Sequence, residues 1–116
     1  MKVVKYKEID PVHFDSDVAK GVAGRVLIGK KDGADRFCMR IFELTPGGYT
    51  PKHAHDWEHE IFVHAGRGEV YLEGRWHGIA EGTAVFVPAG KDHQVRNAGE
   101  APLAFVCLIP AGAPEM

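Results

Sequence analysis

Short apolar stretches alternate along the chain with turn-forming residues. The stretches are rich in Val, Ile, Phe and Tyr, and each ends at Gly or Pro, which is typical of antiparallel strands. No window longer than two helical turns shows the 3.6-residue apolar period of a helix. We therefore expect an all-β chain with strands over residues 25–28, 37–44, 60–64, 69–72, 76–79, 84–87, 93–97 and 103–109.

The residues between these strands favour turns, because glycine adopts positive φ at little cost in free energy and proline fixes φ at a value that suits a turn. The expected turns are Pro46-Gly47-Gly48, Gly66-Arg67-Gly68, Gly74, Glu81-Gly82 and Pro88-Ala89-Gly90. Residues 1–24 are predicted to form an N-terminal arm with one or two edge strands, 25–110 the β domain, and 111–116 a short tail. Periodicity alone does not choose between a sandwich and a barrel.

Composition limits the possible functions. The chain has 116 residues, 45% of them hydrophobic and 26% charged, which suits one ordinary globular domain. Its net charge is −2 and no basic stripe is present, so we expect no nucleic-acid partner. The first ten residues lack the apolar core of a signal peptide, and no apolar run approaches the roughly 20 residues of a membrane helix. We therefore expect a cytoplasmic protein with no membrane partner, and reduced thiols at Cys38 and Cys107.

Four of the seven histidines occur in two tight settings. His53 and His55 are two residues apart, so on an extended chain their imidazoles lie on one face and can reach one ion. His59 shares their parity, although a bend at Asp56-Trp57 could break it. His93 follows the 88–90 turn and is a candidate fourth ligand. This pattern favours a metal site over histidines that serve only to pack the core.

The same residues carry a resemblance to a known family. Two cupin motifs, G-x5-H-x-H-x3,4-E-x6-G and G-x5-P-x-G-x2-H-x3-N, match this chain at Gly47, His53, His55, Gly66, Gly82, Pro88, Gly90, His93 and Asn97. The chain thus resembles a small single-domain cupin of the cupin 2 type. The resemblance implies a double-stranded β-helix, or jelly-roll, barrel, with the motif glycines, Pro88 and Asn97 holding its turns.

Position 59 departs from the motif, since most cupins have glutamate there. Glu60 fits the looser spacing, but the residue six positions beyond it is Arg67 rather than glycine, whereas counting from His59 reaches Gly66. We therefore predict a site of His53, His55, His59 and His93. Such a site resembles a subgroup of small cupins that hold manganese. The resemblance favours manganese, then iron; zinc, nickel or copper would also suit imidazole ligands.

Four neutral ligands leave both charges of a divalent ion uncancelled, so an anionic or enolate ligand should be attracted. Six-coordinate geometry would leave two adjacent positions open, whereas tetrahedral zinc would close the site. The first hypothesis is a metal-dependent, dioxygenase-like oxidoreductase acting on a small organic substrate. One alternative is a non-catalytic module that binds a metal or a small molecule. Another is that the metal ion only stabilises the fold of the barrel.

Four residues from neighbouring strands are candidates for the substrate pocket: Phe105, Cys107, Thr50 and Arg40. Each of them could equally be ordinary packing, and Cys107 in particular could be a buried core thiol. His13, His64 and His77 match no motif position and are expected at the surface or in hydrogen bonds. The resemblance also implies a homodimer, formed through edge strands of the N-terminal arm.

Overall fold

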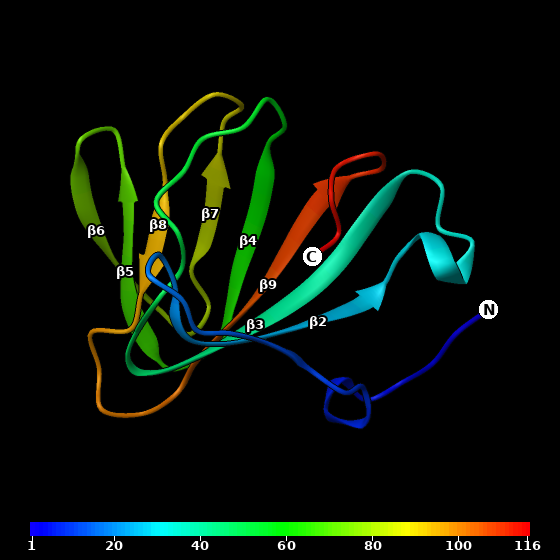
Figure 1. The fold of residues 1–116 in the computed structure, drawn as a ribbon, viewed down its shortest axis with the longest axis horizontal. Helices are drawn as coiled ribbons and strands as arrows, with labels where there is room; N and C mark the ends of the chain where they lie inside the picture. The colour runs from blue at the N-terminus through cyan, green and yellow to red at the C-terminus, as the bar shows by residue number, and fades with distance from the viewer.

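Nine strands and two short 3-10 turns make up the computed structural model, which describes residues 1–116 (Figure 1). The elements are η1 (Tyr6–Glu8), β1 (Val12–Phe14), β2 (Lys20–Ile28), η2 (Lys30–Asp32), β3 (Phe37–Tyr49), β4 (His59–Ala65), β5 (Arg67–Leu72), β6 (Arg75–Ala80), β7 (Ala84–Val87), β8 (Gln94–Arg96) and β9 (Leu103–Pro110). The all-β prediction is confirmed, and each of the eight expected strands overlaps an observed one. None of the helical turns has the length and apolar character needed to cross a membrane.

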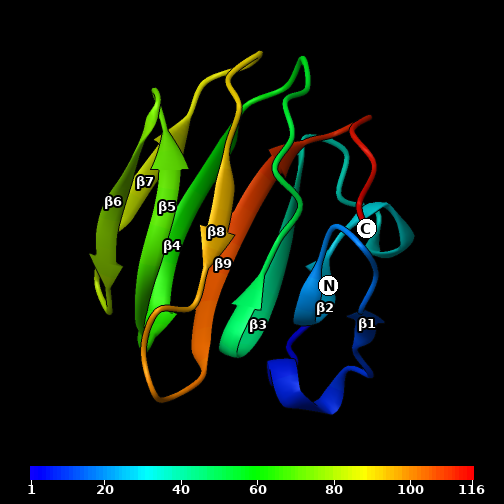
Figure 2. The ribbon, with the colours of Figure 1, turned by 60° about the vertical axis from the view of Figure 1, so that its left-hand side comes forward.

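The strands form one antiparallel sheet in the order β6-β5-β8-β3-β9-β4-β7, with β2 along β3 and β1 along β2. The two ends of this order, β6 and β7, are joined by only three residues, 81–83. The sheet must therefore curl back on itself, as Figure 2 shows. This curl produces the barrel that the cupin resemblance implies.

The turn expected at Pro46-Gly47-Gly48 is wrong, because β3 continues through these residues to Tyr49. These residues form a β-bulge instead. Lys20 of β2 pairs with Tyr49 and Val22 pairs with Leu44, so residues 45–48 lie opposite Gly21 alone. Gly47 has φ 80°, a conformation that favours glycine. Beyond the bulge, β3 pairs with β8 instead of β9. One long strand thus connects both walls of the barrel.

Strict alternation decides which side chains face the interior. In β4 the buried residues are His59, Ile61 and Val63, whereas Glu60 and Phe62 are exposed. In β9 the inward positions are Leu103, Phe105, Cys107 and Ile109, opposite Leu44, Phe42, Arg40 and Cys38 of β3. Most of these belong to one hydrophobic cluster of 13 buried residues. Arg40 therefore occupies a core-facing position directly across from Cys107.

The residues expected to form the N-terminal arm contain η1, β1 and the start of β2. β1 is an edge strand, paired only with β2. The C-terminal residues Pro114 and Met116 return to the mouth of the barrel, where Arg40 Nη1 donates to the Glu115 carbonyl oxygen (3.2 Å).

A candidate metal centre at the barrel mouth

His53 and His93 are brought together by the backbone. They form an isolated antiparallel bridge in which His53 N donates to His93 O (3.1 Å) and His93 N donates to His53 O (3.0 Å). The bridge extends the pairing of Thr50, whose backbone N and side-chain oxygen both bond to Val95. Directly opposed residues of an antiparallel pair point their side chains to one face. The two imidazoles therefore meet, with ring centroids 4.8 Å apart.

His55 and His59 approach from the segment that enters β4. The predicted bend at residues 56–57 is present, yet it does not separate the histidines. Gly90 N donates to His55 O (2.7 Å), which fixes the first arm of the bend against the 88–90 turn. Trp57 stacks on His55 with ring centroids 4.0 Å apart and planes within 4°. His59 begins β4 with its side chain inward, and Glu60 points outward, away from the site.

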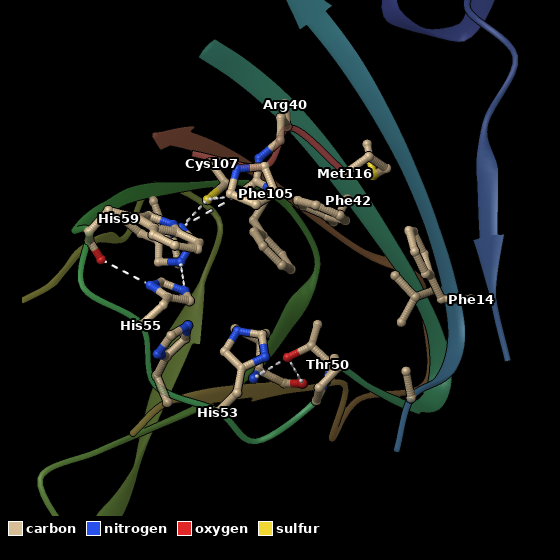
Figure 3. A pocket seen from close by; sticks show the side chains of 18 residues that line it. Phe14, Arg40, Phe42, Thr50, His53, His55, His59, Phe105, Cys107 and Met116 are labelled. Carbon is tan, nitrogen blue, oxygen red and sulfur yellow. Dashed lines mark hydrogen bonds between the residues drawn. The ribbon is translucent and has the colours of Figure 1, made fainter. Parts of the chain in front are cut away.

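His53, His55 and His59 lie together at the barrel mouth (Figure 3), and the ring centroid of His93 is 4.8, 4.9 and 5.0 Å from theirs. Ligand atoms of His53, His55 and His93 all lie within 4.8 Å of one another, a cluster that could hold a metal ion. His59 Nε2 is 2.7 Å from His55 Nε2, and its ring centroid is 5.0 Å from that of His93. His59 therefore lies beside the three-histidine cluster, on its buried side.

The hydrogen bonds of the Nδ1 atoms show whether these residues suit a metal. Nδ1 of His55 is 3.0 Å from the Trp57 carbonyl oxygen, and Nδ1 of His93 is 3.0 Å from the Lys91 carbonyl oxygen. A carbonyl only accepts, so each Nδ1 carries the ring proton and each Nε2 keeps a free lone pair. His59 Nδ1 lies 3.0 Å from Cys107 Sγ and 3.4 Å from Arg40 Nη2. The donor set fits a metal that accepts nitrogen ligands.

The electrostatics of the site also favour the neutral imidazoles of His53, His59 and His93. Burial, followed by the neighbouring histidines and Arg40, lowers the pKa of His59 to about 3 and that of His53 to about 4. Burial likewise lowers the pKa of His93. Metal binding to these rings therefore has no competition from protons near neutral pH.

A cavity of about 260 Å³ extends from the histidines into the barrel. Of its 18 lining residues 10 are hydrophobic, and none is aspartate or glutamate. Phe42 and Phe105 stack against each other in its wall, with centroids 5.7 Å apart, and the Arg40 guanidinium lies 5.0 Å from the Phe42 ring centroid. With a cation and no carboxylate in its wall, the cavity suits an apolar molecule that carries negative charge.

All four candidate pocket residues, Phe105, Cys107, Thr50 and Arg40, line this cavity. Sequence reasoning missed Phe42, which strand alternation from Arg40 could have identified. It also missed Phe14 of β1 and Met116 of the tail, for which no local signal exists. His13 and His64 are exposed, and His77 Nε2 lies 3.2 Å from the Leu72 carbonyl oxygen, so these three stand outside the site.

Comparison with known sequences agrees with this geometry. The family described as Cupin domain matches residues 40–109, more than half of the chain. An oxalate-binding protein of Thermotoga maritima is 31% identical over 115 residues, covering 92% of each chain. The 1-methylthio-D-xylulose 5-phosphate methylsulfurylase of Rhodospirillum rubrum is 29% identical over 73 residues, 63% of this chain and 47% of that protein. The chain thus spans about half the length of this second relative.

Solved structures show the same arrangement of strands. The polyketide cyclase RemF from Streptomyces resistomycificus matches with a TM-score of 0.90 and 35% identity, over 98% of this chain and 82% of that one. A predicted oxalate decarboxylase from Thermotoga maritima matches with a TM-score of 0.83 and 28% identity, over 95% and 99% of the two chains. These similarities cover the whole barrel, including its mouth.

Proposed function

This chain belongs to the cupin domain family, and on that premise we propose that it is a metal-dependent enzyme for an enolisable, anionic organic substrate. The observation that carries the proposal is the three-histidine cluster at the mouth of a largely apolar, carboxylate-free cavity. In this proposal His59 is the fourth ligand, and the ion is manganese, with iron next. A bound ion of this kind would stabilise negative charge on the oxygen atoms of an enolising substrate.

The residues around the ion support substrate binding and the exclusion of water. Phe42, Phe105 and Ile61 supply apolar surface, which favours the carbon skeleton of the substrate. Arg40 supplies a positive charge that no carboxylate cancels, since it forms no ion pair. Substrate anions should therefore bind more tightly than their neutral analogues.

A cyclase reaction has the most extensive support, because the relative named as a polyketide cyclase is 35% identical and covers almost the entire chain. We infer that the substrate is a compound with several carbonyl groups that closes a ring with loss of water. The cavity wall has no acidic residue, and its four histidines are all assigned to the ion, so solvent must move the proton.

The dioxygenase-like oxidoreductase predicted from the sequence is a second proposal for the same site. It shares the need for an enolisable substrate and differs in consuming dioxygen. Non-catalytic binding of a small acid is a third, and the relative named as an oxalate-binding protein favours it. The three proposals predict different measurable outcomes.

The first experiment determines the metal. Protein purified without added metal is subjected to elemental analysis, together with His59→Ala and the control His77→Ala, which alters a histidine outside the site. We expect about one manganese or iron per chain, retained in His77→Ala and strongly reduced in His59→Ala. Zinc bound in His59→Ala as tightly as in the unmodified protein would contradict the four-histidine site.

The second experiment tests turnover of linear compounds with three or more carbonyl groups by the metal-loaded protein. A product lighter by one water, formed without oxygen uptake, supports the cyclase. Oxygen uptake that depends on the substrate supports the dioxygenase instead. Saturable binding of oxalate or another dicarboxylate, with neither reaction, supports the binding module and refutes both enzymes.

A further inference from the structure

His59 differs from the other histidines in what contacts its Nδ1 atom. His55 and His93 contact backbone carbonyls, whereas His59 contacts a sulfur atom and an arginine. We propose that Cys107, held by Arg40, is a positioning residue whose sulfur accepts a hydrogen bond from His59 Nδ1–H and so directs Nε2 to the metal. The inference rests on the proposed metal site and assigns Cys107 a role distinct from lining the pocket.

The placement of the three residues follows from the sheet. Cys107 lies in β9 between Arg40 of β3 and Ile61 of β4, and His59 precedes Ile61 by two residues on the same inward face. Cys107 Sγ is 3.0 Å from His59 Nδ1 and 3.1 Å from Arg40 Nη2 (Figure 3). The exposed fractions are 3% for Cys107, 7% for His59 and 8% for Arg40. Bulk water therefore cannot replace the sulfur as the partner of Nδ1.

The donors and acceptors leave one arrangement that suits metal binding. Arginine only donates, so Arg40 Nη2 donates to Cys107 Sγ. If Arg40 also donated to His59 Nδ1, the ring proton would be on Nε2 and His59 could not bind an ion. That contact is 3.4 Å, longer than an ordinary N–H···N hydrogen bond, whereas the contact with sulfur is 3.0 Å. Binding of an ion at His59 Nε2, which lies 2.7 Å from the unprotonated Nε2 of His55, requires Nδ1–H as the donor and Sγ as the acceptor in the 3.0 Å contact.

The position of β9 explains why a side chain has this role at His59. β9 pairs along its length with β3 on one side and β4 on the other. Its backbone carbonyls are therefore engaged within the sheet and cannot accept from an inward-facing imidazole. A side chain acceptor is needed, and Cys107 is the inward residue of β9 at this level. Hydrogen bonds to the outer nitrogen of a ligand histidine fix its tautomer and its orientation.

The test compares zinc affinity in four proteins: the unmodified chain, Cys107→Val, Cys107→Ser and Cys38→Val. Valine keeps the approximate volume and removes the acceptor, whereas serine keeps an acceptor. Cys38 is a matched control, because it is also 3% exposed in the same sheet and has no contact with His59. We expect a loss of roughly 10- to 100-fold in Cys107→Val, with the other two variants within about threefold of the unmodified chain.

A second readout does not depend on affinity. In the zinc-loaded unmodified protein, ¹⁵N spectra of the imidazoles should show the His59 proton on Nδ1 with Nε2 bound to zinc. A proton on Nε2 would overturn the inference, and this result needs no variant to fold. Equal losses of affinity in Cys107→Val and Cys107→Ser would also overturn it, since lost packing would then explain both.

The zinc measurements also distinguish a failure of this inference from a failure of the proposed metal site. An unmodified protein that binds no zinc, manganese or iron refutes the metal site itself. An unmodified protein that binds zinc, together with a Cys107→Val variant that binds it equally well, refutes the role of Cys107 alone.

Discussion

At the scale of single residues, burial at the barrel mouth favours the uncharged forms of His59 and His93. His59 is 7% exposed and His93 6% exposed, and burial is the largest cause of the lowered pKa of each. A buried imidazole without a carboxylate partner costs free energy once it is protonated. The neutral form that binds a metal is therefore also the form in which the metal-free fold is most stable.

The pH dependence of the stability of the metal-free protein has a contribution from His59, and His53 and His93 act in the same direction. The pKa of His59 is 6.5 in the absence of shifts and about 3 in the fold. Between these values the unfolded chain binds a proton that the folded chain excludes, so the free energy of unfolding falls as the pH is lowered below 6.5. Urea unfolding between about pH 8 and pH 5 measures this slope. His59→Gln should show a shallower slope, and identical slopes would contradict the assignment.

Substitution of Asn97 should lower the stability of the fold without removing the metal site. Asn97 Nδ2 donates to the carbonyl oxygens of Leu44 and Ala101, both at 2.9 Å, and Asn97 Oδ1 accepts from Gly99 N at 2.9 Å. Asn97→Ala leaves these groups unpaired, so we expect a loss of about 2–4 kcal/mol in urea unfolding, with unchanged metal per folded chain. Gln94→Ala, which removes one half-buried bond to Thr50 O, is the control and should cost about 1 kcal/mol. Equal losses in both would argue against this role.

At the scale of the strands and their connections, the backbone of the turn between β4 and β5 lies close to the backbone of the connection that precedes β9. Gly66, between β4 and β5, has φ 82°, and a Cβ there would collide with the Pro102 carbonyl oxygen. Gly74 has a similar φ of 80°, but a Cβ at that position meets nothing within 4 Å. The two positions therefore separate the cost of the backbone conformation from the cost of the collision.

We expect Gly74→Ala to lose about 1 kcal/mol, the cost of placing a side chain at positive φ. Gly66→Ala should lose at least about 3 kcal/mol, because the backbone of the 101–103 connection must also move. Thermal and urea unfolding of both variants provide the comparison. A Gly66→Ala variant as stable as Gly74→Ala would show that the 101–103 backbone moves aside at little cost in free energy.

The strand positions were predictable because each strand carries its own period of two and ends at a turn residue. The inward position of His59 and the outward position of Glu60 came from the same local rule. The error at residues 46–48 came from treating Pro-Gly-Gly as the end of a strand. Its effect depends on the partner strand, and β2 and β8 allow β3 to continue through a bulge.

At the scale of the whole molecule, the candidate metal site joins parts of the chain that are far apart in sequence. His53 follows β3 and His93 precedes β8, and their isolated bridge extends the pairing of these two neighbouring strands. An ion bound by both would hold these distant segments together in the folded state alone, so binding should stabilise the fold.

Metal loading should therefore raise the melting temperature by several degrees, corresponding to about 2.7 kcal/mol at a metal concentration of 100 times Kd. Calorimetry with and without the metal measures the shift, and a chelator should reverse it. His53→Ala should show no increase, whereas His13→Ala should behave as the unmodified protein. A shift that persists in His53→Ala would indicate a metal bound elsewhere.

The homodimer stays a prediction. β1 is an edge strand with free backbone groups on one side, and Val12 in it is half exposed. Sedimentation of the full chain should give twice the mass of 12.7 kDa. Val12→Pro, which removes one backbone donor at this edge, should shift the equilibrium towards the monomer. A monomeric unmodified chain would refute the prediction.

The sequence by itself determined the all-β class, the positions of the strands and the histidines that face the interior. These properties depend on local alternation and on turn residues, which act over a few positions and are readable along the chain. The motif spacing added the prediction that His93 completes the site.

Only the tertiary structure decided which residues surround the histidine cluster. The contacts of Cys107 and Arg40 with His59, and of Phe14 and Met116 with the cavity, depend on the order of the strands in the sheet. Strand order is set by the combined burial of all the strands and by the curl that closes the barrel, and no local pattern encodes it.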